Sequence, residues 1–180
     1  MATVATQRMT GIGSATAGRV GAIAPPVFFA VMIVLGQITS AYNPISRFGS
    51  ELSLGRFGWV MVANFIGLGL AMLILASGLW RAATQAGVTR AGSLLVGLAG
   101  LAFLDAGVFV TDPQHAPATV HGALHVLAAL VLFMIAMPGA CIAFARSHRR
   151  LHGFVQYSVS TAVASPLLFI ATFLSGELLG

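Results

Sequence analysis

Apolar segments long enough to cross a lipid bilayer recur five times along this chain. A membrane-spanning helix needs about 20 predominantly apolar residues, and short polar connections separate five such runs, at residues 20–42, 57–80, 91–112, 118–144 and 155–178. Hydrophobic residues make up 58% of the chain and charged residues only 7%, against roughly 25% charged residues in soluble domains. The sequence therefore predicts an all-α, polytopic membrane bundle with five transmembrane helices.

The arginines indicate how this bundle is oriented. All nine basic residues are arginine, and the cytoplasmic ends of membrane helices carry an excess of basic residues. With a cytoplasmic N-terminus, seven arginines fall on the cytoplasmic side and only Arg47 and Arg56 fall outside. We therefore predict a cytoplasmic N-terminus with a disordered tail over residues 1–19, and no nucleic-acid partner. Five spans place the C-terminus outside, which leaves open whether a sixth helix is missing or is supplied by a partner.

Ionisable side chains gather in one stretch, from residue 105 to residue 125. It holds both aspartates of the protein, Asp105 and Asp112, and three of its five histidines. The aspartates are seven residues apart, and His121 and His125 are four apart, so on helices each pair shares a face. Because a short connection joins spans three and four, we expect these spans to be antiparallel neighbours. The two carboxylates would then face the two imidazoles near the external side.

The functional hypothesis for this stretch is a metal site. Two imidazoles one helical turn apart, completed by a carboxylate from the neighbouring helix, can bind zinc and leave a position for water. We assign Asp105, His121 and His125 as the candidate ligands. Candidate catalytic residues are Asp112 or Glu51 as general base and Ser50 as nucleophile. This constellation would suit a metal-dependent hydrolase that acts on a lipid-like substrate.

Two other classes of function stay open. An aspartate at the centre of a span costs about 2.5–3.5 kcal/mol, but Asp105 can repay that cost structurally by bonding His125 or Asn64. The protein would then be a non-catalytic subunit or assembly factor, which contacts lipids and binds partner membrane subunits through the small-residue faces of spans three and five. A proton-coupled carrier ranks last, because the chain shows no repeat of opposite orientation. Whether the protein is an enzyme is not decided by its sequence.

The order of short motifs resembles a known family. The motifs are Tyr42-x-Pro44, Ser50-Glu51-Leu52, Asn64-Phe65 with Gly67 and Gly69, Gly107-Val-Phe-Val-Thr-Asp112-Pro113, and His121-Gly-Ala-Leu-His125. This order is similar to that of a bacterial membrane family known as domain of unknown function 998, whose members usually have six spans. The resemblance implies a multi-pass protein of the bacterial cytoplasmic (inner) membrane, and it implies no activity.

A looser similarity connects the chain to the superfamily of alkaline ceramidases and adiponectin-type receptors. Those membrane hydrolases bind zinc through a serine, an aspartate and histidines that include a His-x-x-x-His pair. Ser50, Asp105 or Asp112, and His121 with His125 would match these positions. The chain lacks the further histidine that those proteins carry on an early span.

Overall fold

The computed structural model describes residues 13–40, 42–86 and 89–179, and every regular element in these ranges is a helix. Five helical segments are long and apolar enough to cross a membrane, which confirms the predicted all-α membrane bundle. In chain order the elements are α1 (Ser14–Ile38), the 3-10 helix η1 (Gly49–Ser53), α2 (Gly58–Ala86), α3 (Ala91–Val108), α4 (Val120–Leu130), the π-helix η2 (Val131–Ala136), α5 (Met137–Ser147) and α6 (His152–Leu179). Helices α4, η2 and α5 follow one another without a break and form one span.

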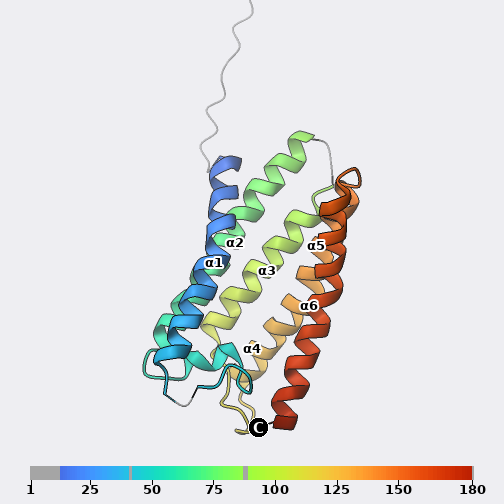
Figure 1. The fold of residues 1–180 in the computed structure, drawn as a ribbon. Coiled ribbons are helices and arrows are strands. Elements are labelled where there is room, and N and C mark those ends of the chain that lie inside the picture. The colour runs from blue at the N-terminus through green and yellow to red at the C-terminus, as the bar shows by residue number, and fades with distance from the viewer. Residues whose placement is uncertain (1–12, 41, 87–88, 180) are drawn as a thin grey trace, which may run out of the picture.

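Helices that are neighbours in the sequence pack side by side (Figure 1). Helix α1 packs on α2, α2 on α3, α3 on the α4–α5 span, and α5 on α6. Helix α3 therefore lies in the middle of the bundle, between α2 and α5. The helix η1 and the loop between α3 and α4 lie at the end of the bundle away from the N-terminus.

The contact between α2 and α3 depends on two glycines. A Cβ atom built on Gly100 would lie 2.9 Å from the carbonyl oxygen of Gly69, and one built on Gly69 would lie 2.8 Å from the carbonyl oxygen of Gly100. Such distances are too short for any other residue, so the two backbones touch directly.

Small residues of spans three and five take part in packing within the chain. The small-residue face of span three is covered by α2 of the same chain. In span five, Ser158 and Ala162 are buried, and α6 packs against α5 and η2. That partners bind through spans three and five stays a prediction.

An aromatic cluster joins three helices in the half of the bundle that carries η1. The rings of Phe28 on α1, Phe65 on α2 and Phe103 on α3 lie with centroid separations of 5.4, 5.7 and 6.3 Å. The His125 ring from α4 meets Phe65 edge-on at 6.0 Å. The cluster therefore fixes the position of α4 and its histidine relative to the first three helices.

Helix α1 begins earlier than predicted. It starts at Ser14 rather than at residue 20, because Ala17 packs against Gly78 of α2 and is fully buried there. Residues 14–19 of the predicted disordered tail are therefore helical, while residues 1–12 lie outside the described ranges. Because of this start, Pro25 and Pro26 lie in the middle of the helix.

A π-helical turn precedes the proline of the fourth span. Proline has no N–H and its ring collides with the carbonyl four residues earlier in an α-helix. The wider turn of η2, immediately before Pro138, relieves this conflict. At this site Ser165 of α6 donates a hydrogen bond to the carbonyl oxygen of Phe133, at 3.2 Å, and the Phe133 ring stacks on Phe169 at 5.1 Å. The irregular turn thus adds one hydrogen bond and one ring contact to the packing of α6, which lies mainly against α5.

Charged residues are separated between the two ends of the bundle. The acidic side chains that the structure describes are Glu51, Asp105 and Asp112, and all three lie at the end that carries η1. Arg47 and Arg56 lie at the same end. The other described arginines lie at the opposite end; they are Arg19, Arg81, Arg90, Arg146, Arg149 and Arg150. This separation is the pattern from which the orientation was predicted.

Candidate functional site

The His125 side chain donates hydrogen bonds to the backbone of the preceding span. Its side chain is buried, and Nδ1 lies 2.8 Å from the carbonyl oxygen of Phe109 and 3.1 Å from that of Ala106. The last carbonyls of a helix have no partner within the helix, and α3 ends at Val108. Because a carbonyl oxygen only accepts, Nδ1 must carry the proton. His125 therefore caps the end of α3, and Nε2 is the ring nitrogen that remains for other interactions.

Asp112 lies in the loop and braces the start of α4. Its carboxylate accepts two hydrogen bonds of 2.7 Å from Thr119, one from the backbone N–H and one from the hydroxyl. The Thr119 hydroxyl oxygen accepts from the N–H of Gly122 and so caps α4. These bonds, with a smaller contribution from the charge of His121, hold the pKa of Asp112 below its ordinary value of 3.8. The network fixes the loop on the helix it precedes.

Space around Asp112 is tight as well. A Cβ atom on Gly122 would collide with the Asp112 carboxylate. Thr119 and Gly122 were not among the residues that we singled out from the sequence. A threonine directly before an apolar helical run is an N-cap signal that can be read from sequence. The hydrogen bonds between Asp112 and Thr119 cannot, because they form only when the loop is folded.

His121 lies on the surface of the same region. It is exposed, and its ring meets the edge of Phe109 at 5.4 Å. Its charge acts on Asp112, so the structure brings these two predicted residues near each other. His121 and His125 do lie one turn apart on α4, as their spacing predicted.

The position of Asp105 differs from the prediction. Helix α3 ends at Val108, so Asp112 is not on it and the two aspartates do not share a helical face. The connection to α4 comprises residues 109–119 and is longer than the predicted five residues. Asp105 is three residues from the helix end, about 4.5 Å along the axis. It is half-buried, and no hydrogen bond or ion pair within the described ranges reaches its carboxylate.

Glu51 and Ser50 belong to the short helix η1. Glu51 is buried; one carboxylate oxygen accepts from the N–H of Phe48 at 3.1 Å and the other pairs with Arg47 at 3.6 Å. The carbonyl oxygen of Ser50 accepts a hydrogen bond from the Ser53 hydroxyl. Glu51 therefore caps η1 rather than standing free as a base.

Tyr42 adjoins this cap. Burial, and then the negative charge of Glu51, raise the pKa of Tyr42 above its ordinary value of 10.0. The Tyr42-x-Pro44 and Ser50-Glu51-Leu52 motifs are thus close in space, at the same end of the bundle as Asp112. Leu52 is buried in the core and anchors η1.

The predicted metal ligands do not form a ligand set. No three His, Cys, Asp or Glu side chains within the described part of the chain gather closely enough to hold a metal ion. His125 donates its Nδ1 proton to carbonyl oxygens at the end of α3, and His121 is exposed beside Phe109. Within the described ranges the Asp105 carboxylate makes no hydrogen bond or ion pair with either imidazole. The residues therefore do not fit the predicted zinc site in this arrangement.

Comparison with known proteins bears on the whole chain. Residues 22–178 match the model of a family described as "Protein of unknown function (DUF998)". No match is found among curated proteins, and none among solved structures. The looser similarity to ceramidases and adiponectin-type receptors therefore receives no support from these comparisons.

Proposed function

Because this chain belongs to the DUF998 family, whose description assigns no activity, we propose from the geometry that it is a non-catalytic component of an assembly in the bacterial inner membrane. It binds a transmembrane partner through the exposed side of α3. The observation that supports this proposal is the carboxylate of Asp105, which lies on that side without a partner of its own.

The docking surface is a stripe on α3, formed by Leu94, Leu101, Asp105 and Val108. The three apolar residues are 61%, 55% and 59% exposed. Spacings of seven, four and three residues keep these positions on one face of a helix. We call this set the α3 stripe. The exposure of its apolar residues shows that the bundle leaves the stripe uncovered, and two of them, Leu94 and Leu101, also line a hollow beside α2.

Contact with lipid alone would leave the Asp105 carboxylate of this stripe unpaired in the hydrocarbon region. Helix α3 has 18 residues, which is about 27 Å of helix, slightly less than the ~30 Å hydrocarbon thickness of a bilayer. Asp105 therefore lies within the outer edge of the hydrocarbon region. Ionisable residues at such depth are expected to pair with another group.

The chemistry of the stripe defines the partner. A neighbouring helix that carries an arginine, a histidine or another hydrogen-bond donor at the depth of Asp105 would pair with the carboxylate. Beside the stripe, a hollow of about 450 Å³ opens between α2 and α3, lined in part by Leu73, Trp80 and Leu98. An apolar side chain of the same partner helix fits this hollow.

Photo-crosslinking in native membranes tests the proposal. A photoreactive residue placed at Leu101 or Val108 is expected to form an adduct with a membrane protein that has a basic or donor group at the crosslinked depth. The Asp105→Asn substitution, which removes the charge and keeps the shape, is expected to reduce that adduct. The same probe at Leu168, an exposed position on α6, is the matched control and is expected to give no such adduct.

Three results would contradict this function. An adduct with twice the mass of the chain would mean that a second copy covers the stripe. An adduct that Asp105→Asn leaves unchanged would mean that the carboxylate has no role in binding. The absence of any adduct at both positions would leave lipid as the only neighbour.

Metal analysis checks the competing hydrolase hypothesis. With the ligand residues placed as described, we expect no stoichiometric zinc in the purified wild-type protein. Zinc at one equivalent that is lost in His121→Ala would restore the hydrolase hypothesis. That outcome would show that the side chains rearrange around the ion.

A further inference from the structure

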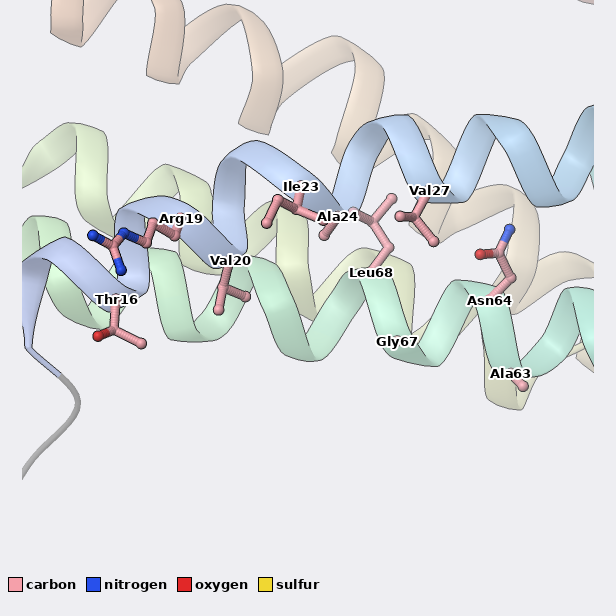
Figure 2. A pocket seen from close by; sticks show the side chains of 10 residues that line it. All are labelled: Thr16, Arg19, Val20, Ile23, Ala24, Val27, Ala63, Asn64, Gly67 and Leu68. Atoms are coloured by element: carbon pink, nitrogen blue, oxygen red, sulfur yellow. The ribbon is translucent and has the colours of Figure 1, made fainter.

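We propose that the groove between α1 and α2 binds one anionic phospholipid of the cytoplasmic leaflet, with its phosphate at Arg19 and one acyl chain along the groove. This inference concerns a surface other than the α3 stripe and does not rest on the proposed partner. Figure 2 shows the groove, with Thr16 and Arg19 near one end and Asn64 towards the other.

The groove is mostly apolar, and at Gly67 its α2 side carries no side chain. Its volume is about 430 Å³, and Ile23 and Val27 of α1 line it. On α2 the lining includes Ala63 and Gly67. No atom lies within 4 Å of where a Cβ atom of Gly67 would stand. The missing side chain therefore leaves open space that the bundle does not fill.

The length of the groove matches one leaflet. Arg19 and Phe28 are nine residues apart on α1, which is about 13.5 Å of helix. The side-chain N–H of Asn64 donates to the carbonyl oxygen of Phe28 at 3.0 Å, so Asn64 marks this second level on α2. Half of the ~30 Å hydrocarbon core is ~15 Å. The groove thus runs from the level of the headgroups to about the middle of the bilayer.

The charge at its mouth selects the headgroup. Arg19 is exposed, and no acidic side chain within the described ranges pairs with it. In the predicted orientation it lies on the cytoplasmic side, where a guanidinium can reach from the helix to the headgroup layer. Guanidinium groups bind phosphate oxygens through two parallel hydrogen bonds. An anionic phospholipid satisfies both the charge and the apolar groove.

Native mass spectrometry of the detergent-purified protein tests this binding. The probes are phosphatidylglycerol and phosphatidylcholine with the same acyl chains. The wild type is expected to bind phosphatidylglycerol more tightly than phosphatidylcholine. The Arg19→Gln variant is expected to lose this preference, with about tenfold weaker binding of phosphatidylglycerol, the size of change that the loss of one charged hydrogen bond produces.

Substitutions that fill the groove distinguish lipid bound in the groove from lipid bound non-specifically around the bundle. The Gly67→Leu variant, and independently Ala63→Leu, is expected to bind both lipids weakly because the side chain occupies the space of the acyl chain. Gly153→Leu is the matched control, since a Cβ atom there also meets nothing within 4 Å. Arg146→Gln, a charge at the same end of the bundle on α5, controls for net charge. Both controls are expected to bind like the wild type.

Two results of these binding measurements would overturn the proposal, provided that the variants are folded. Size-exclusion chromatography first confirms that each variant remains folded and monodisperse. Equal binding of the two lipids by the wild type would overturn the role of Arg19. Unchanged binding in both Gly67→Leu and Ala63→Leu would overturn the groove as the site.

Discussion

At the scale of single residues, the polar side chains at the η1 end of the bundle mostly serve the backbone. His125 is the clearest case, because one buried imidazole satisfies two carbonyls that the end of α3 leaves without donors. Asp112 and Glu51 act similarly on the start of α4 and of η1. Residues that look catalytic in the sequence can therefore be explained by the cost of leaving backbone groups unpaired in an apolar protein.

Replacing His125 is expected to destabilise the protein. In His125→Ala the carbonyls of Ala106 and Phe109 lose their donor, which costs about 1–3 kcal/mol. His121→Ala, one turn earlier and exposed, is expected to stay within about 0.5 kcal/mol of the wild type. Unfolding of the purified protein in detergent measures both values. Equal losses in the two variants would refute the capping role of His125.

Asp112 is expected to make stability depend on pH. Its pKa is lowered in the folded protein, so the ionised carboxylate contributes stability that is complete above the unfolded pKa. This contribution is lost as the pH falls through the folded value, below the ordinary 3.8. At neutral pH, Asp112→Asn should therefore unfold at a lower temperature than the wild type. The difference should shrink as the pH is lowered into this range, and a constant difference would contradict the assignment.

At the scale of elements, the glycine contact between α2 and α3 can be tested by adding single methyl groups. In Gly100→Ala the new Cβ atom would lie 2.9 Å from a backbone oxygen, so the helices must move apart at a cost of about 1–3 kcal/mol. Gly97→Ala is the control on the same helix, because its Cβ atom would make an ordinary 3.6 Å contact with Ala76. Unfolding in detergent should show a loss for the first variant only.

The existence of the helices could be predicted, whereas some of their ends could not. Long apolar runs identify the spans because hydropathy reports burial in lipid. The segment Phe109-Val110-Thr111 is also apolar or β-branched, so hydropathy continues beyond Val108 although the helix has ended. The carbonyls at the end of α3 are capped by the imidazole of His125, which belongs to another helix. Contacts of this kind are not visible in a local pattern.

The predicted site residues lie at one end of the bundle, but their arrangement differs from the prediction. The cluster from Asp105 to His125 lies at one end of the bundle, as spacing and topology indicated. The shared face of the two aspartates was wrong because it assumed a helix through residue 112. The brace between Asp112 and Thr119 forms only when the loop turns back on itself.

At the scale of the whole molecule, the orientation in the membrane is open to direct measurement. In a Cys141→Ala background, which removes the one native cysteine, single cysteines can replace Ile45 or Leu151; both positions are exposed and lie at opposite ends of the bundle. An impermeant maleimide is expected to label Ile45→Cys on intact cells, and Leu151→Cys only after permeabilisation. The reverse pattern would invert the predicted topology.

The separation of charge between the two ends also has an electrical consequence. In the predicted orientation the end with six described arginines faces a cytoplasm that is negative relative to the outside. Moving one charge across 100 mV corresponds to about 2.3 kcal/mol, so carrying those six charges to the outside would cost about 14 kcal/mol. The membrane potential of a living cell would therefore favour this orientation of the inserted bundle over the inverted one.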